Sequence, residues 1–179
     1  MKNLLEKGFT LLELLVVIVL LGLLTSFMML SINISGLESE LDEEANKIYA
    51  LIRLAKEEAI IQAKEIALAI DKQSYVFMEL KKIVKNNKEK YIWEPVNNKI
   101  FRERKLHPGL EIRMETKEEY VFQYKDKRRK LTPTIFSSTG EQSEFILNAY
   151  IKDNKNNYYK IDGKINGDIA IEKITNDDF

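Results

Sequence analysis

Residues 7–30 read KGFTLLELLVVIVLLGLLTSFMML, and this stretch decides how the chain is organised. Between Phe9 and Leu30 the only charged residue is Glu13. A helix over these residues would be roughly 33 Å long, which is enough to cross the hydrocarbon core of a bilayer. The sequence therefore predicts a membrane-spanning helix at the amino end.

The charges on either side of this run predict its orientation. Lys2 and Lys7 precede it, together with Glu6, whereas the first charges after it are acidic, namely Glu38, Glu40, Asp42, Glu43 and Glu44. Basic residues beside a membrane span favour the cytoplasmic side. We expect a single pass with a cytoplasmic amino terminus and the remainder of the chain outside the cytoplasmic membrane.

Two ordinary explanations of the apolar run fit less well. A cleaved secretory signal has a shorter apolar stretch followed by a small-x-small site, and residues 31–36 (SINISG) match that site poorly. A plain single-pass anchor explains the apolarity but not Glu13. A carboxylate inside a membrane helix costs about 3 kcal/mol on insertion scales, so its presence there indicates a function. The alternative is that Glu13, only four residues into the apolar run, reaches the membrane interface.

The string Lys7-Gly8-Phe9-Thr10-Leu11-Leu12-Glu13 resembles the recognition site of prepilin peptidase in type IV pilins and type II secretion pseudopilins. In that family a short basic leader ends in Gly and is followed by Phe-Thr-Leu-x-Glu and an apolar helix. The resemblance implies cleavage after Gly8 and an N-methylated new amino terminus at Phe9. It also implies that Glu13 acts in assembly, by pairing with the terminal amine of a neighbouring subunit.

The same resemblance implies the partners and the role of the chain. The partners would be other pilin or pseudopilin subunits of a filament, prepilin peptidase and the cytoplasmic membrane. The role would be structural, as a subunit of a type II secretion or type IV pilus-type filament, with no enzymatic activity and no cofactor.

Beyond the apolar run the pattern changes to that of an amphipathic helix. Apolar residues recur every three or four positions, at Leu37, Leu41, Ala45, Ile48, Ile52, Ala55 and Ala59. The opposite face is charged and is expected to meet solvent; it holds Glu43, Glu44, Lys47, Arg53, Glu57 and Glu58. Gly22 and the pair Ser35-Gly36 are expected weak points where this long helix would bend or melt. The stripe predicts a helical face that packs against a folded head.

After residue 65 the pattern becomes that of β-strands. Strands are expected at 66–70, 75–80, 90–93, 110–115, 120–124, 134–137, 144–152, 158–162 and 169–174. Turn signals lie at 86–87, 97–98, 108–109, 139–140, 153–154 and 166–167. We predict an α+β fold in which one long helix packs on an antiparallel sheet. The expected parts are a prepilin leader (1–8), a transmembrane and assembly helix (9–30), an amphipathic helix (31–65) and a β-rich soluble head (66–179).

The head carries a second, looser resemblance. The segments 135–140 (IFSSTG) and 167–171 (GDIAI), and the helical stretch 54–66 (LAKEEAIIQAKEI), are similar to regions of the H-type minor pseudopilins and FimT-type minor pilins (GspH/FimT). This resemblance implies a minor subunit that caps or initiates a short filament.

Composition excludes several kinds of chemistry. Lys and Arg total 28, as do Asp and Glu, so no global field attracts a charged partner. The chain has no Cys, and its single His, His107, precedes Pro108-Gly109 in an expected loop. No nucleophile elbow, phosphate-binding loop or metal-ligand cluster is present, and the scattered C-terminal Asp residues do not form a regular calcium loop.

One basic patch leaves an alternative open. Residues 125–130 (KDKRRK) hold five cations in six positions. The simple interpretation is a solvated hairpin turn that protects a sheet edge. The alternative is that Lys127, Arg128, Arg129 and Lys130 contact DNA beside Tyr124, as in a DNA-binding minor pilin of a competence pilus.

Overall fold

The computed structural model describes the backbone of residues 11–85, 88–117, 122–123 and 130–175. The chain divides into two compact units, Met1–Glu38 and Ser39–Phe179. Helix α1 (Leu11–Ile61) supplies the described part of the first unit and the beginning of the second. Its backbone is helical at both Gly22 and Gly36, so the helix does not melt at these expected weak points.

The predicted stripe on the second half of the helix is confirmed. Six of its seven residues are at most 2% exposed, and only Leu37 is half-buried. The buried members are Leu41, Ala45, Ile48, Ile52, Ala55 and Ala59. Because these residues recur at helical spacing, they present one continuous apolar face to the strands.

The carboxyl end of α1 has a defined cap. The amide of Ala63 donates to the carbonyl of Ile60 at 3.2 Å, and that of Lys64 donates to Ala59 at 2.9 Å. Ala63 has a φ of 50°, the left-handed conformation that this Schellman arrangement requires and that usually selects glycine. The cap satisfies two helix-end carbonyls and turns the chain into the first strand.

The strands form two antiparallel sheets. Sheet A has the order β3-β2-β1-β7-β6, and β4 also pairs with β2. Its strands are β1 (Ile66–Asp71), β2 (Ser74–Lys85), β3 (Lys88–Pro95), β4 (Arg104–Lys105), β6 (Phe122–Gln123) and β7 (Lys130–Phe136). Sheet B has the order β10-β9-β8-β5. Its strands are β5 (Leu110–Thr116), β8 (Phe145–Ile151), β9 (Asn154–Gly163) and β10 (Ile169–Thr175).

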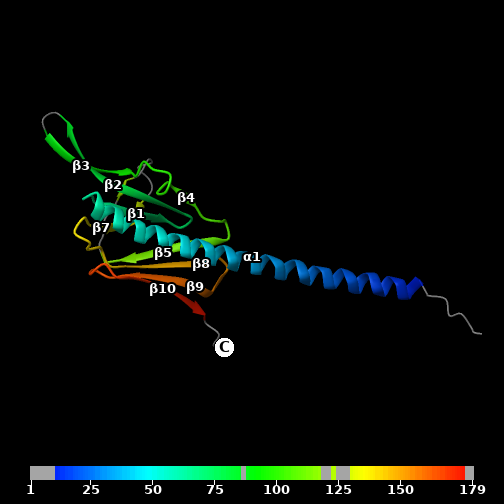
Figure 1. Ribbon diagram of the computed structural model, residues 1–179. Coiled ribbons are helices and arrows are strands. Elements are labelled where there is room, and N and C mark those ends of the chain that lie inside the picture. The colour runs from blue at the N-terminus through cyan, green and yellow to red at the C-terminus, as the bar shows by residue number, and fades with distance from the viewer. Residues whose placement is uncertain (1–10, 86–87, 118–121, 124–129, 176–179) are drawn as a thin grey trace, which may run out of the picture. The chain divides into compact units, whose positions relative to one another are not determined.

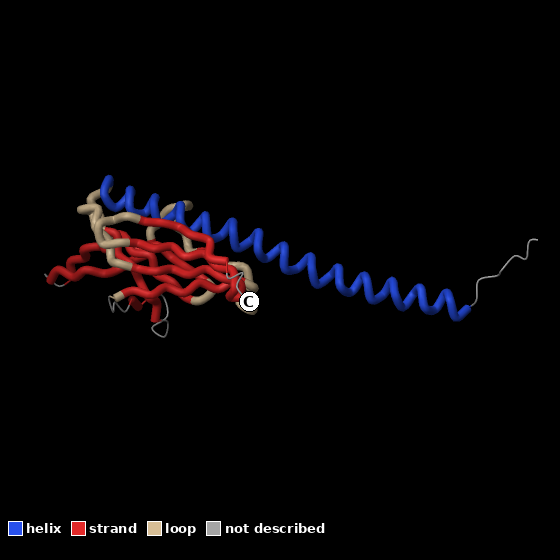
Figure 2. Tube along the Cα trace, turned by 90° about the horizontal axis from the view of Figure 1, so that it is seen from below, coloured by secondary structure: helices blue, strands red, loops and turns tan. Residues whose placement is uncertain are grey.

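Residues 39–61 of α1 lie along both sheets. Figure 1 shows the two sheets beside each other along this helix segment, and β5 contacts both β1 and β7. Figure 2, turned by 90°, shows both sheets on the same side of the segment. The main core therefore lies between this part of α1 and the two sheets, and it includes Phe77, Phe101, Phe136, Leu68 and Leu147, each at most 2% exposed.

Part of the other face of sheet A is buried as well. Ala67 and Ala69 of β1 cluster with Val76 and Met78, all four at most 3% exposed, and Trp93 and Ile135 pack against them. Since successive residues of a strand point to opposite faces, β1 buries its Ile and Leu side chains on one face and its Ala side chains on the other.

The α+β fold is confirmed, and most expected strands form within a few residues of their predicted ends. Strand β4 was not predicted, and β2 extends to Lys85, beyond the expected end at 80. The expected turn at 86–87 and residues 120, 121 and 124 of one expected strand lie outside the described residues.

Gly163 is required by the packing of an aromatic ring. It pairs with Phe145 across β8 and β9, and a Cβ at Gly163 would overlap the Phe145 ring, lying 2.6 Å from its Cδ1. Phe145 is 2% exposed and makes an edge-to-face contact with Phe136. The ring thus fills the space that a side chain at Gly163 would need.

Replacing Gly163 with valine should lower the free energy of unfolding by about 1–3 kcal/mol, because the ring must leave its buried position. Denaturant unfolding of the full chain in detergent measures this. The matched control is Gly36→Ala, since nothing lies within 4 Å of a Cβ at Gly36 and alanine favours a helix. Equal stability of Gly163→Val and the unaltered chain would show that the ring adapts without cost.

Candidate functional site

The first described part of α1 exposes a continuous apolar surface. Every large apolar side chain from Leu11 to Leu24 is at least 42% exposed, and these residues cover all sides of the helix. An exposed apolar surface of this extent is typical of a segment that contacts lipid or other helices. It is the candidate assembly surface of the chain.

Glu13 lies in the first turn of α1, and its side chain is exposed. An acidic residue in the first turn interacts favourably with the positive end of the helix dipole. The structure therefore places Glu13 on the apolar surface, near the end of the described helix. The two predicted processing residues, Gly8 and Phe9, lie outside the described residues.

The structure describes only part of the other residues that the sequence singled out. Lys127, Arg128 and Arg129 lie outside the described residues, and Lys130 is the first residue of β7, with a side chain that is also outside them. His107 accepts a hydrogen bond from the amide of Gly109 at its Nδ1, in the expected loop.

Two kinds of feature are absent from the described ranges. Within those ranges, no helix is both long enough and apolar enough to cross a membrane. Nor do three His, Asp or Glu side chains in the described part of the chain come together to hold a metal ion.

A polar contact fixes the second half of α1 to sheet A. The Tyr75 hydroxyl donates to Glu44 Oε1 at 2.8 Å, and Lys47 Nζ donates to Glu44 Oε2, also at 2.8 Å. Burial raises the pKa of Tyr75 well above its usual range, and the charge of Glu44 adds to this effect. The helical pattern predicted a solvent-facing position for Glu44, but its carboxylate is directed to β2.

A second contact fixes the same helix to the β9–β10 turn. Lys56 Nζ donates to the carbonyl of Gly167 at 2.6 Å. Gly167 has a φ of 89°, and a Cβ there would overlap Lys56 and lie 2.6 Å from the Gly140 carbonyl. The turn at Gly167 thus meets the helix at Lys56, 111 residues earlier in the chain, and also lies against the turn at Gly140. No local sequence signal identifies such a contact.

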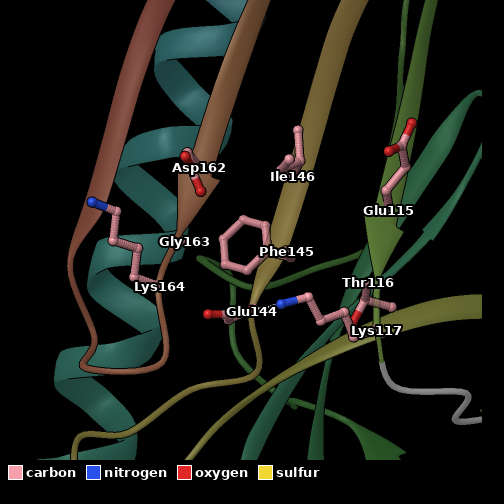
Figure 3. Close-up of a pocket in the computed structure, with 9 residues that line it drawn as sticks. All are labelled: Glu115, Thr116, Lys117, Glu144, Phe145, Ile146, Asp162, Gly163 and Lys164. Atoms are coloured by element: carbon pink, nitrogen blue, oxygen red, sulfur yellow. Dashed lines mark hydrogen bonds and ion pairs between the residues drawn. The ribbon is translucent and has the colours of Figure 1, made fainter.

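A groove of about 520 Å³ opens at the ends of β5, β8 and β9. Figure 3 shows the Phe145 ring beside Gly163, with Lys117 and Glu144 near it. Lys117 Nζ lies 2.6 Å from Glu144 Oε2. The residues that line the groove include no His, and the only side-chain hydroxyl among them belongs to Thr116.

Glu79 of β2 is a buried carboxylate held by two lysines. It is 8% exposed, and its oxygens lie 2.9 Å from Lys81 Nζ and 3.3 Å from Lys64 Nζ. Burial alone would raise the pKa of Glu79, but the hydrogen bonds from Lys81 and Lys64 outweigh it and lower the pKa below its usual value. Stability from this group is therefore present above the unfolded-state pKa and is lost as the pH falls through the folded-state pKa.

Glu79→Gln should lower the free energy of unfolding at pH 7 by about 1 kcal/mol, and the difference should shrink as the pH falls below about 4. Denaturant unfolding at both pH values measures it. Glu89→Gln is the control, because Glu89 forms an exposed ion pair with Lys82 and should have little effect at either pH. A deficit of Glu79→Gln that stayed constant with pH would contradict the assigned ionisation.

Comparison with known proteins bears on the first thirty residues. Residues 4–29 match the family described as the prokaryotic N-terminal methylation motif. The match covers the end of the predicted leader, Gly8, Phe9 and Glu13.

Curated relatives extend the likeness into the head. The chain is 31% identical over 91 residues to the type II secretion system protein H of Pseudomonas aeruginosa, covering 51% of this chain and 49% of that protein. It is 24% identical over 164 residues to the type II secretion system protein H of Aeromonas hydrophila, covering 87% of this chain and 86% of that protein. The chain is thus similar to H proteins of the type II secretion system, both in its amino-terminal segment and in its head. The aligned part spans about half the length of the first of these relatives and most of the second.

Solved structures agree with the fold of this chain. Two structures of the minor pseudopilin EpsH from the type II secretion system of Vibrio cholerae match it, each with a TM-score of 0.55. They are 21% and 19% identical in sequence, and they cover 74% and 78% of the pilin-like chain and 96% of each EpsH chain. At this identity they support the pseudopilin fold, a helix packed on antiparallel sheets.

Proposed function

We propose that the chain is a minor structural subunit of a membrane-rooted filament, of the type II secretion or type IV pilus kind. One observation carries this proposal. The chain has a methylation motif at residues 4–29, and 87% of the chain, including most of the head, aligns with the type II secretion system protein H of Aeromonas hydrophila. The likeness thus includes both the segment used in assembly and the head.

In this proposal the leader is removed by prepilin peptidase on the cytoplasmic face. Cleavage after Gly8 frees the amine of Phe9, which is then methylated. Residues 9–30 anchor the subunit in the cytoplasmic membrane before assembly, and the head lies outside. The support is the sequence itself, because Glu13 is the only charge between Phe9 and Leu30.

Assembly would use the exposed apolar surface of α1. When helices of neighbouring subunits pack, the carboxylate of Glu13 would pair with the free amine of another subunit. A pair of opposite charges is far less costly in an apolar surrounding than either charge alone. The pairing would also set the axial register between subunits, since a shift by one helical turn would separate the charges.

The head would serve as a rigid module held on residues 39–61 of α1. The buried stripe, the Tyr75–Glu44 bond and the Lys56–Gly167 bond fix the sheets to this segment. We assign the head a structural role without catalysis. The sequence carries no catalytic motif, and the relatives are named as components of a secretion system.

Isolation of filaments tests the proposal. Cells that express the chain together with the other subunits of their filament system are sheared, and the pelleted filaments are analysed by mass spectrometry. We expect the chain in the pellet with other subunits that carry the same amino-terminal motif. Recovery of the chain only from the membrane fraction, while the other subunits pellet, would overturn the proposal.

A further inference from the structure

A cavity of about 350 Å³ lies between α1 and the segment that leads into β4. Its lining residues are all charged: Glu44, Lys47, Arg102, Glu103, Arg104 and Lys105. Four cations thus face two carboxylates, in a chain whose overall net charge is zero. The excess positive charge at this site is local.

Both carboxylates are already engaged within the chain. Glu44 accepts hydrogen bonds from Tyr75 and from Lys47, each at 2.8 Å, and Lys47 also lies 3.5 Å from Glu43. Lys47 is therefore largely neutralised by its own helix. The remaining positive charge comes from Arg102, Arg104 and Lys105, and Glu103 offsets one of these three charges.

Arg104 is held in place with one donor unsatisfied. Its backbone pairs with Tyr75 across β4 and β2, and its Nη2 donates to the carbonyl of Ile100 at 2.9 Å. Its Nε is buried and has no hydrogen-bond partner among the described residues. A buried donor without an acceptor is unfavourable, and guanidinium groups bind planar oxyanions through several N–H groups at once.

We propose that this cavity is a carboxylate-binding site, which takes one acidic side chain of a neighbouring protein. An Asp or Glu carboxylate would be held by the exposed cations of Arg102 and Lys105, beside the partly exposed guanidinium of Arg104, whose Nε–H reports the added charge. The inference rests on the proposed filament role only in that this role supplies the neighbour.

The charges around the cavity favour a single carboxylate over a nucleic acid. Glu43, Glu44 and Glu103 lie in or beside the cavity, so a polyanionic backbone would meet negative charge next to each cation. Nucleic-acid sites neutralise several phosphates along a cationic track, which this arrangement does not provide. A single ligand carboxylate can lie next to the cations without coming close to all three glutamate side chains.

The test follows the Arg104 Nε–H signal of the full ¹⁵N-labelled chain in detergent micelles, with the signal assigned by its loss in Arg104→Lys. The probe is the blocked tripeptide acetyl-Ala-Glu-Ala-amide, and its matched control is the same peptide with Gln in place of Glu. We expect the Glu peptide to shift the signal in a saturable manner and the Gln peptide to leave it unchanged. Arg102→Gln and Lys105→Gln should each weaken binding by about threefold to tenfold, because each removes one charge–carboxylate contact at an exposed position.

Arg113→Gln, which removes an exposed cation from sheet B, should leave the affinity for the Glu peptide unchanged. Equal shifts by both peptides, no shift by either, or a shift only with a single-stranded oligonucleotide would overturn the proposal. None of these results bears on cleavage or filament incorporation, so failure here is distinct from failure of the proposed function.

Discussion

Replacing Glu13 with valine should leave the chain processed and inserted in the membrane but should exclude it from filaments. Valine is easier to insert than glutamate, by about 3 kcal/mol on insertion scales, so anchoring should not suffer. The loss should fall on assembly, because the amine of a neighbouring subunit would lose its carboxylate. Removing one partner of a buried ion pair costs about 3–5 kcal/mol, which predicts near absence of the variant from the filament fraction.

The measurement compares the variant in sheared filaments with the variant in membranes by immunoblot. Glu40→Val is the control, since Glu40 is an exposed carboxylate on the same helix but lies beyond the apolar run. This control should enter filaments normally. Incorporation of Glu13→Val at the level of the unaltered chain would show that the carboxylate does not pair subunits.

Replacing Gly8 with valine should leave the leader attached. A branched side chain beside the scissile bond opposes the extended, unobstructed backbone that the peptidase needs. We expect cleavage to slow by at least about tenfold, which corresponds to about 1.4 kcal/mol in the barrier. A gel would show a band larger than the mature chain by the eight leader residues, and Phe9 would carry no methyl group.

Gly22→Val is the matched control for this experiment. Gly22 lies within α1, and nothing lies within 4 Å of a Cβ there, so the substitution should not alter processing. Cleavage of Gly8→Val at the normal rate would place the scissile bond elsewhere.

The features that could be predicted from the sequence are those encoded locally. The helical stripe at Leu41, Ala45 and Ile48 follows a fixed spacing, so the sequence alone identifies the buried face of α1. The strands and their turns likewise follow from alternation and from residues that favour turns. The amino-terminal signature is also local, because a peptidase and a membrane both recognise a short continuous segment.

The features that could not be predicted depend on residues far apart in the chain. Strand β4 has only two residues and exists through its pairing with Ser74 and Tyr75. The cavity at Arg104 depends on that pairing and on the position of Glu44 in α1. Ala63 takes the left-handed conformation of the helix cap without being glycine, so composition gave no indication of it.

The mass of the amino-terminal peptide of the chain, taken from purified filaments, tests the central claim most directly. The claim is that this chain is cut after Gly8 and then assembled through the helix that the cut exposes. We expect a peptide that begins at Phe9 and carries one N-methyl group. An assembled chain that still begins at Met1, or that begins at a residue other than Phe9, would contradict it.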